Sequence, residues 1–337
     1  MAENVDIEEI CSITRKPRGR GFEYFDKNRL KIRSRGFLRY VKNLAIPPMW
    51  QDVGISTDQQ YRIQAIGYDV KKRKQYIYHP DWVAQQQAQK FAKLLDFSQA
   101  LPHMRGLILK NSEQPTWNIE KVAALATRIL DETGIRIGNK QYSQQNETFG
   151  LTTLRRKHLN SSDDFIELDF KGKHGQRRRV TIEDTQLVSL IESSAEKPGY
   201  SLLRYKESGK WYDLTSDEVN QYIRSISGAD FTSKDFRTWA GTRLAVEYAA
   251  ECEYIVSQYP RKRFKSTLVK KVAGALGNTP AICEKYYIHP KVLEYLIAMH
   301  KKGQSVGPCP HAISNTSELS ECEQLAQTMI QGNSPLS

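Results

Sequence analysis

Several features of exported and membrane proteins are missing from this 337-residue sequence. No apolar run reaches the roughly 18 residues that a membrane span needs. The N-terminus carries Asp6, Glu8 and Glu9 where a secretory signal would carry basic and then apolar residues. The five cysteines form an odd set without a Cys-x-x-Cys pair, which argues against a disulfide framework and a zinc site. We therefore expect a cytoplasmic protein with reduced thiols, no zinc site and no membrane contact.

Acidic residues are scarce in two separate stretches of the chain. The net charge is +12, and residues 15–42 hold eleven Lys and Arg against only Glu23 and Asp26. Residues 261–271 hold six Lys and Arg and no acid. One such block alone is most simply a solvated surface. Several blocks that are distant in sequence favour a polyanion as partner, so we predict nucleic acid binding.

Changes of composition predict two domains with a segment at either end. An apolar content of 39% and this length fit two modest cores. We expect a flexible basic segment at 1–21, a β-rich domain at 22–88, a mainly α-helical domain at 89–303 and a polar, loosely ordered tail at 304–337. The predicted fold class is therefore α+β.

Strand patterning characterises the first domain. Polar and apolar residues alternate from Tyr61 to Ile66 and again from Lys74 to Tyr78. The basic cluster at 71–74 between them predicts a charged hairpin turn. A glutamine-rich run at 85–89 then precedes helical spacing, so we place the domain boundary there.

Helical periodicity characterises the second domain. We expect helices around 122–130, 188–191, 219–226, 239–248, 268–276 and 280–299. The exception is a pair of strands at 165–170 and 177–182, joined by a glycine-bounded turn that carries Lys173.

Four side chains of this domain stand in patterns that suit chemistry on a phosphate. Arg136 follows a helix, Lys173 lies in the hairpin turn and Arg237 opens a helix. Tyr287 follows Pro280, which suits a first helical turn. Taken singly, each is more simply a surface ion pair, a solvated lysine or a half-buried aromatic. Their order and spacing favour one common site.

In that order, the segments resemble the active-site boxes of type IB DNA topoisomerases, in the short poxvirus-like form found in bacteria. The resemblance extends from about residue 22 to about residue 300. The matching stretches are 46–53, 63–69 and 73–82 in the first domain, and 134–138, 149–154, 170–173, 234–239 and 276–287 in the second. Each stretch is a weak signal alone, whereas eight in sequence are a strong one.

The resemblance implies relaxation of supercoiled DNA by transient cleavage of one strand. Tyr287, nine residues after Asn278, takes the nucleophile position, with Tyr286 as its neighbour. Its phenol would attack a phosphodiester to form a 3′-phosphotyrosyl link and a free 5′-hydroxyl. One ester replaces another, and the chain has no GxxxxGK[ST] phosphate loop, so the resemblance implies neither ATP nor metal.

The cationic residues would stabilise this reaction. Arg136 and Arg237 match the pair that grips the non-bridging phosphate oxygens, because a guanidinium stays charged and offers paired donors. Lys173 matches the general acid of the departing 5′-oxygen, and we expect nearby arginines to lower its pKa. Asn278 departs from the poxvirus pattern, which commonly has histidine there. A carboxamide donates a hydrogen bond but shuttles no proton, so Asn278 is expected only to bind the transition state.

The resemblance also implies a monomer that forms a clamp around duplex DNA, its two domains joined near 85–92. Gln64, Lys74, Tyr76 and Tyr142 match positions that touch DNA, although a strand-packing role explains Tyr76 equally well. Such a protein would be associated with the nucleoid.

Two other functions fit parts of the pattern. A tyrosine recombinase or integrase uses similar residues, but its second arginine typically follows a histidine in HxxR, where this chain has Lys234-Asp235-Phe236-Arg237. A DNA-binding module with a decayed site is the other, and the chain retains every expected group except the histidine of the poxvirus pattern, which Asn278 replaces.

Overall fold

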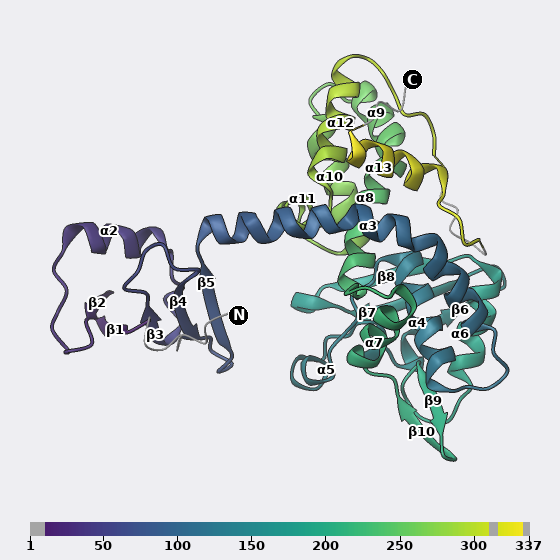
Figure 1. Cartoon of the computed structure of the whole chain (residues 1–337), viewed down its shortest axis with the longest axis horizontal. Coiled ribbons are helices and arrows are strands. Elements are labelled where there is room, and N and C mark those ends of the chain that lie inside the picture. Colours follow the sequence, from purple (N-terminus) through teal and green to yellow (C-terminus); the bar gives the residue numbers. More distant parts are fainter. Residues whose placement is uncertain (1–10, 310–315, 333–337) are drawn as a thin grey trace. The chain divides into compact units, whose positions relative to one another are not determined.

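The computed structural model (Figure 1) describes residues 11–309 and 316–332, apart from the side chain of Tyr142. The chain divides into two units, Met1–Lys90 and Phe91–Ser337, two residues beyond the expected boundary. No loop separates them, because helix α3 (Pro80–Ser112) runs through the dividing point. The glutamine-rich run at 85–89 is therefore helical. Within the described residues, no helix is long and apolar enough to cross a membrane.

Unit 1 is built on one five-stranded antiparallel sheet in the order β2-β1-β3-β4-β5. Its elements are β1 (Ile13–Arg18), β2 (Gly21–Phe25), α2 (Arg35–Asn43), β3 (Gln51–Ile55), β4 (Ile63–Tyr68) and β5 (Lys74–Tyr78). Its core contains Ile13, Val41, Val53, Ile55 and Ala65. The predicted hairpin is confirmed, since β4 and β5 pair with Ile66 opposite Tyr76. The Asp69 carboxylate orders its basic turn by accepting from the backbone N–H groups of Lys71 and Arg73.

The expectation of a flexible segment at 1–21 is wrong from residue 13 onward. β1 and β2 form a hairpin in which Ile13 is buried and the Arg15 guanidinium lies 4.1 Å from the ring centre of Phe22. β1 carries Arg15, Lys16 and Arg18 and buries only Ile13, so it lacks the regular apolar alternation that predicts a strand. Residues 1–10 lie outside the described part of the chain.

Unit 2 is mainly helical, with two small sheets. Its further helices are α4 (Ile119–Thr133), α5 (Lys140–Asn146), α6 (Thr185–Ala195), α7 (Ser216–Ser227), α8 (Ser233–Glu247), α9 (Ala249–Gln258), α10 (Phe264–Leu276), α11 (Pro280–Tyr286), α12 (Pro290–Lys301) and α13 (Glu321–Gln331). β6 (Leu159–Ser161), β7 (Ile166–Lys171) and β8 (Arg177–Ile182) form one antiparallel sheet, and β9 (Arg204–Glu207) and β10 (Lys210–Asp213) form the other.

Two almost fully buried helices, α4 and α8, lie at the centre of unit 2. α4 packs against α6, α7 and α8, and α8 also packs against α10, α12 and α13 (Figure 1). The side chain of Asn118 caps α4 by accepting from the Lys121 N–H, and Gly134 ends it in the left-handed conformation. These ends matter because the loop after α4 carries Arg136.

The helix expected at 280–299 is interrupted. α11 ends at Tyr286 and α12 begins at Pro290, so Tyr287, Ile288 and His289 form a short connection. Proline disfavours the helical conformation in the residue before it, and His289 is accordingly extended, with ψ at 128°. The break places Tyr287 at a helix end.

The expectation of a loosely ordered tail is wrong for its described C-terminal part. α13 begins with a capping box between Ser320 and Glu323 and packs against α8. The Glu323 carboxylate is completely buried, where Arg105 donates to both of its oxygens and the Trp239 indole N–H donates at 2.8 Å. This pairing offsets the cost of burying charge.

The expectation of reduced thiols is wrong for two of the five cysteines. Cys309 and Cys322 form a disulfide, with their Cα atoms 5.7 Å apart. Cys11, Cys252 and Cys283 are free and buried. The bond links the segment after α12 to α13, a proximity that the sequence did not reveal.

Candidate active site

The loop after α4 places Arg136 beside the C-terminal end of α10. Gly134 has φ +59°, and a Cβ atom there would lie 2.8 Å from the Cβ of Ala240, so the loop passes against α8. From this loop, Arg136 donates at 3.1 Å to the carbonyl of Gly277 and also to Oδ1 of Asn278. The predicted neighbours Arg136 and Asn278 are therefore in direct contact.

Arg237 projects from α8 toward the same C-terminal end of α10. Its side chain is 4% exposed and donates to the carbonyl of Leu276 at 2.6 Å and to that of Gly134. Burial lowers its pKa to about 10, helped by the charge of Arg136. The guanidinium remains protonated near neutral pH, so it is a largely desolvated cation.

Two buried hydrogen-bond donors at this site lack a partner among the described residues. They are Nε of Arg237 and Nδ2 of Asn278. Buried donors are almost always satisfied, and an unsatisfied one costs about 1–3 kcal/mol. A pair of them beside clustered guanidinium groups fits an anion that supplies several acceptor oxygens.

A third arginine, which the sequence did not single out, belongs to this cluster. Arg178 of β8 donates to the carbonyls of Gly274 at 2.8 Å and Ala275 at 2.6 Å. Burial lowers its pKa, as it does for Arg136, and the charge of Arg136 adds to the effect. Within the described residues, none of the three arginines forms an ion pair with a carboxylate.

Tyr287 lies next to Arg237 at the end of α11. The Arg237 guanidinium is 4.9 Å from the centre of the Tyr287 ring. This contact places a positive charge beside the ring of the predicted nucleophile. The structure therefore brings Arg136, Arg237, Asn278 and Tyr287 together, as the sequence predicted.

Two neighbouring residues of α8 fix the backbone of Tyr287. A Cβ atom at Gly241 would lie 2.6 Å from the carbonyl oxygen of Tyr287, so only glycine leaves room for this close approach. The Thr242 hydroxyl lies 3.3 Å from the same oxygen and accepts from the His289 N–H at 3.1 Å. The sequence signal for this contact is a glycine inside a helix, which usually has a packing reason.

Lys173 is not in contact with this cluster. It is exposed in the turn between β7 and β8, and within the described residues its ammonium group makes no hydrogen bond or ion pair. A hydrogen bond from the Gly172 N–H to the Gln176 carbonyl, at 2.7 Å, closes the turn behind it. Lys173 therefore belongs to the element that also carries Arg178, without an interaction of its own.

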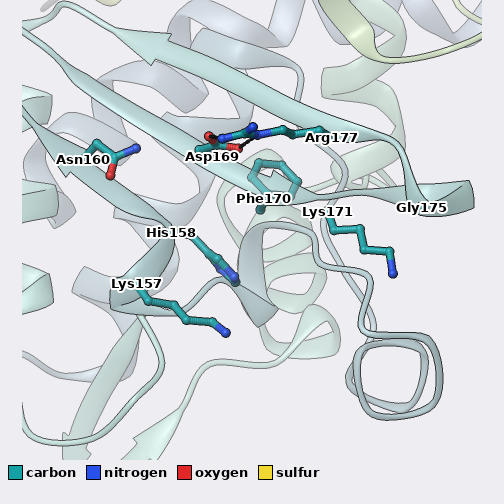
Figure 2. Close-up of a pocket in the computed structure, with 8 residues that line it drawn as sticks. All are labelled: Lys157, His158, Asn160, Asp169, Phe170, Lys171, Gly175 and Arg177. Carbon is teal, nitrogen blue, oxygen red and sulfur yellow. Dashed lines mark hydrogen bonds and ion pairs between the residues drawn. The ribbon is translucent and has the colours of Figure 1, made fainter.

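A cavity of about 620 Å³ lies on the sheet that carries this turn. Figure 2 shows its lining residues, which are Lys157, His158, Asn160, Asp169, Phe170, Lys171, Gly175 and Arg177. Asp169 accepts from Arg177 at 2.8 Å, whereas Lys157 and Lys171 are not drawn with a partner (Figure 2). The cavity does not include Arg136, Arg237 or Tyr287, so its basic lining is separate from the tyrosine cluster.

The four predicted DNA contacts have different environments. Gln64 is 1% exposed, accepts from the Tyr40 hydroxyl and donates to the Tyr61 carbonyl, so its amide does not face solvent. Lys74 is half-buried at the start of β5, and Tyr76 is exposed in the middle of the same strand. Tyr142 belongs to α5, and its side chain lies outside the described part of the structure.

Comparison with known proteins identifies the family. A model of the catalytic core of eukaryotic DNA topoisomerase I matches residues 71–306, and a model of the N-terminal domain of bacterial DNA topoisomerase IB matches residues 21–69. DNA topoisomerase 1B of Acanthamoeba polyphaga mimivirus is 31% identical over 281 residues, which cover 81% of this chain and 83% of that protein. DNA topoisomerase 1B of vaccinia virus (strain Copenhagen) is 24% identical over 241 residues, or 69% of this chain and 72% of the relative.

Solved structures give a weaker likeness. A post-cleavage complex of the XerH site-specific recombinase aligns with 69% of this chain and 59% of its own, at 15% identity and a TM-score of 0.36. This similarity is too low to carry an argument. The match to the catalytic-core model spans more than half of the sequence, and the chain therefore belongs to the family of type IB DNA topoisomerases.

Proposed function

We propose that this enzyme relaxes supercoiled duplex DNA by cutting one strand with Tyr287 and then resealing it, without ATP or metal. The observation that carries the proposal is the pair of unsatisfied buried donors, on Arg237 and Asn278, beside the phenol of Tyr287. A scissile phosphate bound there would supply the missing acceptors. It would also lie beside the tyrosine.

The chemistry follows from these groups. The Tyr287 oxygen attacks the phosphorus, and the bond from phosphorus to the 5′-oxygen breaks as the phosphotyrosyl bond forms. Arg136 and Arg237 neutralise the charge that develops on the non-bridging oxygens, with Asn278 as an uncharged donor. In the reverse reaction the 5′-hydroxyl attacks the phosphotyrosyl ester. Side chains supply the positive charge, so we expect the reaction to proceed in EDTA.

We assign protonation of the departing 5′-oxygen to Lys173. Its ammonium group is exposed and makes no hydrogen bond or ion pair within the described residues, so no interaction must break before it turns toward DNA. A general acid at this position contributes about 10²–10⁴-fold to the rate. Lys173→Ala should therefore slow cleavage while leaving DNA binding largely intact.

Binding of the duplex rests on phosphate contacts from each unit. In unit 1, Tyr76 stacks on Tyr78, with ring centres 5.9 Å apart, and the basic turn at 71–74 adjoins this exposed face. In unit 2, Lys157 and Lys171 line the basic cavity. We include Lys74, Tyr76 and Tyr142 among the contacts and leave out Gln64, because its amide is already hydrogen bonded. That the two units close around DNA stays a prediction.

Plasmid relaxation tests this function. The wild-type protein should relax supercoiled plasmid in EDTA without nucleotide, over a series of salt concentrations because phosphate contacts weaken with salt. One strand is cut by one tyrosine, so a monomer should suffice for relaxation. We expect it to act in the cytoplasm, on nucleoid DNA. Failure to relax plasmid at every salt concentration would favour a binding module, and a strict requirement for two specific sites would favour a recombinase.

The nucleophile is tested by a matched pair of variants. Tyr287→Phe should abolish both relaxation and the covalent adduct, whereas Tyr286→Phe should retain them. Peptide mapping of the adduct trapped on a nicked suicide substrate identifies the linked residue directly. An adduct that persists in Tyr287→Phe would contradict the assignment.

A further inference from the structure

We propose that Arg178 is a positioning residue, which anchors the Lys173 turn to the arginine cluster at the end of α10. The inference rests on the proposed function, since it concerns delivery of the general acid. It differs from the roles of Arg136 and Arg237, because Arg178 is proposed to act through another residue and not on the phosphate.

The strand register selects Arg178 from three consecutive arginines. Arg177 and Arg179 both pair with Asp169 and are largely exposed, with side chains 69% and 58% accessible. Side chains alternate between the faces of a strand, so Arg178 points the other way. It lies opposite Phe170 in the register and reaches α10.

The Arg178 side chain contacts both the turn and the site. At its base, a Cβ atom on Gly172, the residue before Lys173, would lie 2.9 Å from the Cγ of Arg178. At its tip, the guanidinium donates to the carbonyls of Gly274 and Ala275, and a Cβ atom on Gly277 would lie 2.5 Å from its Nε. Gly277 directly precedes Asn278. One side chain therefore connects the backbone beside the general acid to the backbone beside the phosphate-binding amide.

The electrostatic cost of placing the Arg178 guanidinium near Arg136 indicates a role beyond stability. A half-buried cation near Arg136 is unfavourable unless something offsets it. The carbonyls at a helix C-terminus carry partial negative charge, and here those of Gly274 and Ala275 provide that offset. On the opposite face of the strand, Arg178 could pair with a carboxylate, as Arg177 and Arg179 do with Asp169. Its position on the face toward α10 instead fixes the distance between the Lys173 turn and the arginine cluster.

The test compares two substrates that differ in the leaving group. After the cleavage site of the wild-type enzyme has been mapped, single-turnover cleavage is measured on a suicide duplex with an ordinary phosphodiester and on one with a 5′-bridging sulfur at the same bond. A thiolate leaves without a proton, so a defect in general acid catalysis disappears on the sulfur substrate. A defect in phosphate binding remains.

The expected results separate three classes of variant. Arg178→Met should cleave the oxygen substrate about 10²-fold more slowly than wild type and the sulfur substrate at nearly the wild-type rate. Lys173→Ala should show the same pattern, and Arg237→Met should be slow on both. Arg179→Met, the exposed neighbour that does not line the basic cavity, should match wild type on both.

Other outcomes would overturn the inference. They are wild-type cleavage of the oxygen substrate by Arg178→Met, or an equal loss on both substrates. Thermal unfolding checks that the variant is folded, and Arg178→Lys, which keeps the charge but not the fork of donors, should show the same substrate dependence if Arg178→Met does not fold. A wild-type protein that cleaves neither substrate would instead contradict the proposed function.

Discussion

The contact between Gly241 and Tyr287 makes a quantitative prediction. A methyl group at position 241 would lie 2.6 Å from the Tyr287 carbonyl oxygen and 3.0 Å from its Cβ, whereas ordinary contact begins at 3.4 Å. In Gly241→Ala, α8 and the tyrosine must therefore separate by the difference, 0.8 Å. A displacement of about 1 Å at a reacting group can cost about 10²-fold in rate.

The effect on stability should be small by comparison. Overpacking destabilises a protein by about 1–3 kcal/mol, whereas alanine in place of glycine stabilises a helix by about 1 kcal/mol. We expect Gly241→Ala to remain folded with a free energy of unfolding lowered by about 0–2 kcal/mol. The variant should thus remain folded while its rate of adduct formation falls by about 10²-fold.

The assay is the rate of covalent adduct formation on a suicide substrate in a single turnover, with urea unfolding measured in parallel. Gly274→Ala is the matched control, because a Cβ atom there meets nothing within 4 Å although the residue is also helical and near the site. It should keep the wild-type rate. Our reasoning is refuted if folded Gly241→Ala forms the adduct as fast as Gly274→Ala.

Three further predictions concern buried polar groups. Glu323→Ala should lower the free energy of unfolding by about 3–5 kcal/mol, because it leaves Arg105 with only part of its buried pairing, whereas exposed Glu321→Ala should cost less than about 1 kcal/mol in urea unfolding. Burial, with a contribution from a nearby lysine, lowers the pKa of His289 to about 4 from 6.5, so the folded state favours the neutral ring. That stability, about 3 kcal/mol, is complete above pH 6.5 and is lost as the pH falls toward 4; His289→Asn should flatten this slope in unfolding experiments at several pH values, and an unchanged slope would contradict the assignment. Asn278→Asp should slow adduct formation more than Asn278→Ala, since a carboxylate beside Arg136 repels the phosphate; equal rates would argue against direct contact.

The sequence predicted the elements whose signals are local. The helices α4, α6, α7, α8 and α10 and the strand pairs β4–β5 and β7–β8 lie where periodicity indicated. The cluster of Arg136, Arg237, Asn278 and Tyr287 was also expected, because each residue lies in a stretch that resembles an active-site box of the family. Lys173 was placed in the right turn, and its role stays a prediction.

The features that sequence reasoning missed depend on distant partners. Three consecutive arginines look alike until the strand register separates Arg178 from its neighbours. The burial of Glu323 depends on Arg105, which is 218 residues away. Two local signals were nevertheless present, since Pro290 marks the end of a helix before it and the Ser320–Glu323 spacing marks the start of α13.

The partners of the three arginines affect how an anion would enter the site. Their described acceptors are backbone carbonyls and one side-chain amide, all of them neutral. An arriving phosphate therefore displaces no competing carboxylate from these described arginines. The same neutral partners leave these arginines able to bind other small oxyanions, so sulfate or inorganic phosphate should act as a competitor of DNA.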